Sequence, residues 1–229
     1  MSDRNDTPAI DVEEVLNRVG DPEAFITQLR EARKERQLRR NIFIENLSPE
    51  VKAEWINGEA VYHSPAKESH NATTSGLMQL LTNYDSFVER IYVRAEKAMI
   101  EAGEHNFEPD VCIWVAEDHT FSPDTMIYPR PDIAVEVLSP RTEGRDLGVK
   151  KREYARAGTA EYWVVDAIEW TLLQFVNVDG AFEERRTFRK GDNFVSVKLP
   201  RLAFPLTAIW DWDLRKATSR AWVLADKSS

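Results

Sequence analysis

The sequence has one cysteine, Cys112, in 229 residues, so the chain cannot form an internal disulfide. Cys112 lies in an apolar run, VCIWV, and no basic residue stands beside it to lower the pKa of its thiol. We therefore expect a buried core thiol rather than a nucleophile. A chain without disulfides fits a reducing compartment, which predicts a cytoplasmic protein.

Long hydrophobic runs are also missing. No segment approaches the roughly 20 apolar residues of a membrane-spanning helix, and the N-terminal sequence MSDRNDTPAIDVEEV lacks the apolar stretch of a secretory signal. The sequence thus predicts no membrane association.

Basic residues are in the minority. The chain has 30 Lys and Arg against 39 Asp and Glu, for a formal net charge of −9. This balance disfavours strong nonspecific binding to duplex nucleic acid. It leaves room for a local basic groove, and clustered carboxylates are what a metal site requires.

The most informative stretch runs from 131 to 166. An apolar run, Ile133 to Leu138, is followed by a polar connection ending at Asp146, a helix-favouring segment from 147 to 157, and a second apolar run, Tyr162 to Val165. Asp146 is expected to cap the helix, and Gly158 to end it in a left-handed turn. A strand, a helix and a strand at this spacing predict a βαβ unit with parallel strands.

One carboxylate, Glu136, lies in the middle of the first apolar run. Burying a carboxylate costs free energy unless a cation, a proton or several donors compensate it. Glu136 therefore needs a partner. Asp110, after Pro109, opens another expected strand, 111–115. Acidic side chains on two neighbouring strands can hold a hard divalent cation such as Mg²⁺.

The rest of the chain divides into an N-terminal helical extension, 1–45, and an α/β domain, 46–229. The extension is expected to start loosely ordered and then to form a helix over 22–40, whose basic second half indicates a solvated face or a partner-docking arm. In the domain we expect a helix over 69–84 and a hairpin at Asp179-Gly180. The remaining expected strands are 42–44, 55–62 around Asn57-Gly58, 90–100 and 193–199.

The segments PDIAVEVLSP and RDLGVKKREYARAGTAEYWVVD resemble the signature of the Uma-type restriction endonuclease family, a bacterial branch of the PD-(D/E)XK nuclease superfamily. The resemblance covers about 54 to 206. It implies a restriction-endonuclease-like core, a mixed central sheet flanked by helices, with extra β-hairpins on the C-terminal side. It also implies metal-dependent hydrolysis of DNA phosphodiester bonds.

The resemblance assigns roles to individual residues. Asp110 and Glu136 match the metal-binding acids, with Mg²⁺ or Mn²⁺ as the expected ion. Lys150, on the helix, stands in for the superfamily lysine, whose usual position is occupied by Leu138. Glu59 and His70 are secondary catalytic candidates. DNA is the expected substrate, and cutting both strands points to a homodimer or to two separate nicks.

Each candidate also has a simpler interpretation. Asp110 is a common residue in turns after proline, Glu136 can be neutralised by an arginine, and Lys150 resembles any solvated helix lysine. His70 can be a capping or packing residue. The alternative function is therefore a nuclease-like binding module that has lost catalysis, and only the joint pattern favours the enzyme.

Overall fold

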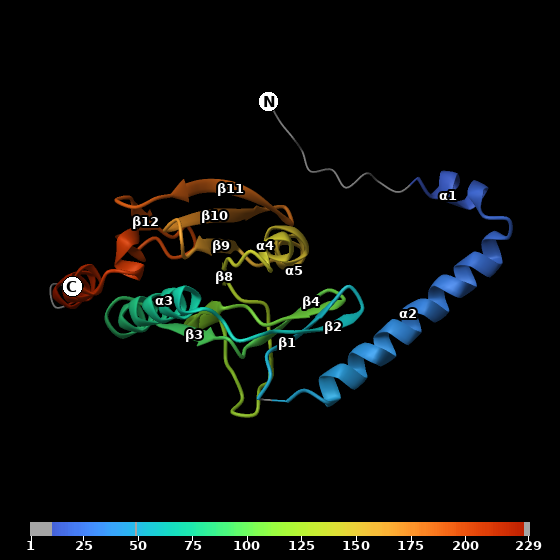
Figure 1. The fold of residues 1–229 in the computed structure, drawn as a ribbon, viewed down its shortest axis with the longest axis horizontal. Coiled ribbons are helices and arrows are strands. Elements are labelled where there is room, and N and C mark those ends of the chain that lie inside the picture. Colours follow the sequence, from blue (N-terminus) through green and yellow to red (C-terminus); the bar gives the residue numbers. More distant parts are fainter. Residues whose placement is uncertain (1–10, 49, 227–229) are drawn as a thin grey trace. The chain divides into compact units, whose positions relative to one another are not determined.

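The computed structural model describes residues 11–48 and 50–226. The chain separates into two compact units, with the division between Asn46 and Leu47. The first unit is helical (Figure 1), and its helices are α1 (Val12–Arg18) and α2 (Pro22–Glu45). Asp21 caps α2 by accepting a hydrogen bond from the amide of Ala24, and Pro22 occupies the first turn, where its missing N–H costs nothing.

The expected strand at 42–44 is wrong, because these residues continue α2 to Glu45. Extending an existing helix adds one hydrogen bond for each residue fixed, whereas an isolated three-residue strand needs a partner. The helix that was expected to end at 40 is correspondingly longer.

The second unit is an α/β unit with three sheets (Figure 1). The six-stranded sheet has the order β11 (Ala181–Phe188), β10 (Thr171–Val178), β9 (Glu161–Asp166), β8 (Ile133–Val137), β6 (Val111–Val115), β3 (Ile91–Ala95). The five-stranded sheet has the order β2 (Glu59–Tyr62), β1 (Ala53–Ile56), β5 (His105–Phe107), β4 (Met99–Ala102), β7 (Ile127–Tyr128). The third sheet pairs β12 (Asn193–Val195) with β13 (Ala203–Pro205).

Helical segments connect and cover these sheets. They are α3 (Glu68–Phe87), η1 (Ala116–Asp118), α4 (Glu143–Arg145), η2 (Asp146–Lys150), α5 (Lys151–Ala157), η3 (Leu206–Ile209) and α6 (Trp212–Asp226). The six-stranded sheet is mixed, since β8 and β9 are parallel and its other neighbours are antiparallel. The expected βαβ unit is confirmed, and Gly158 ends α5 with a φ of 88°.

Both expected tight turns are confirmed. Asn57 and Gly58 join β1 to β2 with φ values of 54° and 87°, and Asp179 and Gly180 join β10 to β11 with φ values of 51° and 84°. Positive φ at both central residues is the geometry that matches the twist of a two-residue hairpin. The C-terminal hairpins therefore form as the sequence indicates.

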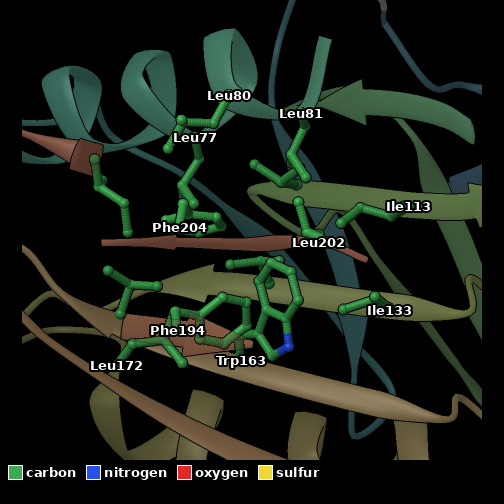
Figure 2. Close-up of a cluster of buried hydrophobic side chains, with 14 of the residues drawn as sticks. Leu77, Leu80, Leu81, Ile113, Ile133, Trp163, Leu172, Phe194, Leu202 and Phe204 are labelled. Carbon is green, nitrogen blue, oxygen red and sulfur yellow. The ribbon is translucent and has the colours of Figure 1, made fainter. Parts of the chain in front are cut away.

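The hydrophobic core occupies both faces of the six-stranded sheet. On one face, Leu77, Leu80 and Leu81 of α3 pack with Ile113 and Ile133, together with side chains from β9, β10, β12 and β13 (Figure 2). On the other face, Cys112 and Ala134 pack with α5 and the five-stranded sheet. Alternation along β6 and β8 thus assigns odd-numbered residues to the α3 face and even-numbered residues to the opposite face.

The chain crosses between the two large sheets several times, and two of these crossings are short. It leaves β3 at Ala95 and enters β4 at Met99, and it leaves β5 at Phe107 and enters β6 at Val111. The single strand expected over 90–100 is therefore wrong. Glu96 breaks it with a φ of 66°, and its amide donates to the carbonyl of Asp110, which brings the two crossing points together.

Cys112 is a buried free thiol, as expected, and burial raises its pKa well above the ordinary value. Among the described residues, 11–48 and 50–226, none of the helices has the length and apolarity needed to span a bilayer.

Candidate active site

Asp110 lies at the second of the two short crossings, directly before β6. Its Oδ2 accepts a hydrogen bond of 2.8 Å from the amide of Val137 and lies 3.0 Å from Nε2 of His70, while its Oδ1 accepts from Nζ of Lys52 at 2.7 Å. Since β6 pairs with β8, this network fixes the carboxylate beside the end of β8.

Glu136 lies within β8 at an even-numbered position, on the face of Cys112 and Ala134. Asp110 directly precedes β6, and its carboxylate accepts from the amide of Val137, the residue after Glu136. The register that pairs Val111 with Val135 brings the two acids to neighbouring positions, and their carboxylates interact electrostatically. Oε1 of Glu136 accepts hydrogen bonds from Nζ of Lys150 at 2.9 Å and from the hydroxyl of Tyr154 at 3.2 Å.

Lys150 reaches Glu136 from a widened helical turn. The turn η2 has π-helical hydrogen bonding and begins at Asp146, whose side chain caps no amide. The expected capping role of Asp146 is therefore wrong, because the helical segment already starts at Glu143. Instead, Asp146 and Lys150 both point inward, with Nζ 3.5 Å from Oδ1 of Asp146. Single π-helical turns are frequent at functional sites.

Glu54 is a further buried carboxylate in this cluster. It lies in β1, and its Oε1 accepts from Nζ of Lys150 at 2.9 Å and from the amide of Glu108 at 2.9 Å. Its Oε2 lies 2.8 Å from Nε2 of His63. Lys150 thus joins Glu54 and Glu136, which come from different sheets. The sequence does contain the signal, since Glu54 stands among apolar neighbours in β1 as Glu136 does in β8.

Lys52 and Glu96 complete the site, and neither is among the residues predicted from the sequence. Nζ of Lys52 bridges Oδ1 of Asp110 at 2.7 Å and Oε2 of Glu96 at 2.8 Å. Nothing in the local sequence marks either residue, because their proximity to Asp110 depends on the two crossings between sheets.

The secondary candidates differ in placement. His70, in the first turn of α3, contacts Asp110. Glu59 is exposed on β2, next to the turn of the first hairpin, whereas Asp110, Glu136 and Lys150 are buried. The structure therefore brings together Asp110, Glu136, Lys150 and His70, and it does not bring Glu59 to them.

Burial opposes ionisation of these carboxyl groups, and nearby cations decide the direction of each shift. Burial would raise the pKa of Glu54, but Lys150 and His63 outweigh it and lower that pKa to about 2. Burial likewise acts against Asp110, yet His70 and Lys52 hold its pKa below the usual range. For Glu136, burial wins over Lys150, with Asp146 and Asp110 adding to it, and the pKa lies well above the ordinary value.

The donor groups fit a divalent cation. The site contains more carboxylates than ammonium groups, with Glu54, Glu96, Asp110, Glu136 and Asp146 around Lys52 and Lys150. His70, Glu96 and Asp110 each offer a ligand atom, and these atoms lie within 4.8 Å of one another. Carboxylate oxygens suit Mg²⁺ and Mn²⁺, and imidazole suits transition metals. A bound cation would offset the negative charge of the neighbouring carboxylates, which adds to burial in raising the pKa of Glu136.

The second unit thus has a mixed α/β fold, with α3 on one face of the six-stranded sheet and α5 on the other. Its fold resembles the crystal structure described as a putative nuclease belonging to DUF820 from Anabaena variabilis. The TM-score is 0.62 at 18% sequence identity, covering 74% of this chain and 96% of that one. The expected fold class is thus confirmed.

The family model of Uma2, described as "Putative restriction endonuclease", matches residues 37–207. The chain belongs to this family, as the sequence signature indicates. A comparison with curated proteins found no match.

Proposed function

We propose that the protein is a divalent-metal-dependent DNA endonuclease that hydrolyses phosphodiester bonds. The observation that carries the proposal is the proximity of two acids: Asp110 accepts from the amide of Val137, and Glu136 directly precedes Val137 in β8, with the ammonium of Lys150 at 2.9 Å from Glu136. Family membership supports the reaction class.

Asp110 and Glu136 are the residues proposed to hold Mg²⁺ or Mn²⁺. When bound, such an ion lowers the pKa of a coordinated water and offsets charge on the scissile phosphate. The hydrogen bonds from Val137 and His70 keep the carboxylate of Asp110 oriented. The hydroxyl of Tyr154 and the ammonium of Lys150 do the same for Glu136.

Lys150 acts, in this proposal, as a positioning residue. Its side chain is only 3% exposed and contacts three carboxylates. Contact with water or phosphate would require breaking these buried ion pairs, whereas holding Glu54 and Glu136 in place requires no movement.

Plasmid nicking with added Mg²⁺ or Mn²⁺ tests the proposal. We expect the wild type to nick DNA and Glu136→Gln to lose at least about 100-fold in rate, because replacing even an outer partner of a metal site typically costs about 10–100-fold. Glu183→Gln, at an exposed carboxylate of β11, is the matched control and should keep wild-type activity. Equal cleavage by the wild type and Glu136→Gln would sink the proposal.

The second candidate is a nuclease-like binding module without catalysis. The structure offers one observation in its favour, since Lys52 and Lys150 already neutralise part of the acidic cluster. If Glu136 serves only as an ion-pair partner, Glu136→Gln should lose a few kcal/mol of stability, as for a broken buried pair. If it also serves as a metal ligand, Glu136→Gln should in addition weaken Mn²⁺ binding, which the loss of an ion pair alone does not predict.

A further inference from the structure

Lys52 is held at the edge of the acidic cluster by the first hairpin. It directly precedes β1, and its carbonyl accepts a hydrogen bond of 3.0 Å from the amide of His63, just beyond β2. This backbone contact fixes where the side chain starts. Its ammonium then spans Asp110 and Glu96 at 2.7 and 2.8 Å.

Lys52 and Lys150 differ in their freedom to move. The side chain of Lys150 is 3% exposed, and that of Lys52 is 17% exposed. One partner of Lys52, Glu96, is 39% exposed. Lys52 is therefore less deeply buried than Lys150. Its ammonium can exchange its carboxylate contacts for solvent more easily than that of Lys150 can.

The ammonium of Lys52 contacts the same cluster of residues that offers ligand atoms for a cation. Two of the three residues in that group, Glu96 and Asp110, are the two partners of Lys52. A divalent ion and an ammonium within about 4 Å repel each other strongly in a partly buried site. The ion and the ammonium therefore compete for these carboxylates.

We propose that Lys52 is the resident counter-ion of Asp110 and Glu96, that a divalent cation bound to Asp110 displaces it, and that the displaced ammonium binds a phosphate of the substrate. The inference deepens the proposed function and relies on it for the substrate alone. The exchange of cations is a property of the chain itself.

The proposal predicts two effects of opposite sign. Removing the Lys52 ammonium should tighten metal binding, because the competing charge is gone, and should weaken DNA cleavage, because a phosphate contact is lost. If Lys52 had only a structural role, its replacement would weaken both metal binding and cleavage. The opposite signs therefore separate the two roles.

Calorimetric titration with MnCl₂ tests the exchange directly. We expect Lys52→Met to bind Mn²⁺ at least about tenfold more tightly than the wild type. Lys97→Met is the matched control, since Lys97 is 42% exposed and its ammonium is directed to Glu108, at 4.0 Å, and to the carbonyl of Val51. It should bind Mn²⁺ as the wild type does. Equal or weaker binding by Lys52→Met overturns the proposal.

A second measurement covers the case in which Lys52→Met folds poorly without metal. Thermal unfolding with EDTA and with Mn²⁺ should then show a larger rise in Tm for Lys52→Met than for the wild type, because tighter binding to the folded state stabilises it more. Lys52→Arg keeps the charge and should respond to Mn²⁺ as the wild type does. A smaller rise for Lys52→Met than for Lys52→Arg overturns the proposal.

Failure of the inference and failure of the proposed function have different signatures. If the wild type cleaves DNA but Lys52→Met does not bind Mn²⁺ more tightly, the inference alone fails. If the wild type cleaves no DNA but Lys52→Met still binds Mn²⁺ more tightly, the cation exchange stands and the nuclease proposal fails. Absence of Mn²⁺ binding in both proteins overturns both.

Discussion

Lys150 connects the two large sheets through a single ammonium group. Its three carboxylate partners come from β1, β8 and η2, and within residues 11–48 and 50–226 none of them forms an ion pair with another lysine or arginine. Lys151, the next residue, places its ammonium 3.9 Å from the ring centre of Phe175 instead. Lys150 thus neutralises buried carboxylates, whereas the adjacent Lys151 contacts an aromatic ring.

Replacing each lysine by methionine should expose this difference. We expect Lys150→Met to lose roughly 3–5 kcal/mol of unfolding free energy, because its carboxylates are left buried without a cation. Lys151→Met should lose less than about 1 kcal/mol, the usual worth of an exposed cation–π contact. Urea denaturation of both variants measures this, and similar losses would contradict the assignment.

At the residue scale, the sequence predicted the acids that carry a local signature. Asp110 follows a proline before a strand, and Glu136 interrupts an apolar run, so both stand out in the printed chain. The same criterion, a single acid among apolar residues, identifies Glu54 in β1. It does not identify Glu59, which the resemblance suggests. Lys52 and Glu96 have no such signature, because only the crossings between sheets bring them to Asp110.

At the scale of elements, α3 approaches the C-terminal segment most closely at Gly76. A Cβ atom there would lie 1.9 Å from the carbonyl oxygen of Ile209 in η3. In the sequence this glycine argues against a helix. In the structure it lets the helix backbone pass beside η3 without a side chain between them.

A pair of glycine substitutions tests this packing. Gly76→Ala should destabilise the protein by about 1–3 kcal/mol or more, since backbone atoms must move apart. Gly148→Ala, where a Cβ meets nothing within 4 Å, should be neutral or stabilising by up to about 1 kcal/mol, because alanine favours a helical backbone. The melting temperatures of the two variants measure this difference. A comparable fall in both would contradict a close contact between α3 and η3 at Gly76.

Elements with local determinants were predictable from sequence, and those with tertiary determinants were not. The βαβ unit and the two glycine turns follow from hydrophobic pattern and turn chemistry. The break at Glu96 follows from its hydrogen bond to the carbonyl of Asp110, a contact between two sheets. No local pattern in 90–100 records that contact.

At the scale of the whole molecule, opposing pKa shifts set the pH at which the metal-free protein is most stable. The lowered pKa of Glu54, about 2 against an ordinary 4.5, gives stability that is present above pH 4.5 and lost as pH falls toward 2. Asp110 acts in the same direction. Protonation of these carboxyl groups should therefore unfold the protein in acid.

Other groups act in the opposite direction. The pKa of His70 is raised above 6.5, against the effect of burial, by its hydrogen bond to Asp110, so its stabilisation is complete below pH 6.5 and declines above it. The raised pKa values of Glu136, Glu108 and Asp146, caused first by burial, make stability fall as pH rises above their ordinary values.

Thermal unfolding in EDTA from pH 3 to 8 should therefore show maximal stability between about pH 4.5 and 6.5. Saturating Mn²⁺ should move the maximum to higher pH, because metal binding favours ionised carboxylates. A maximum above pH 7 in EDTA would contradict the shifts that the site implies.

The hydrogen bond from the Val137 amide to Asp110 has an evolutionary consequence. A descendant that abandoned phosphodiester chemistry would still need an oxygen acceptor at position 110 to satisfy that amide, so asparagine or aspartate should persist there. Glu136 accepts only from side chains, Lys150 and Tyr154, and can drift together with them. Loss of the second acid, and not retention of the first, is therefore the better mark of a retired enzyme.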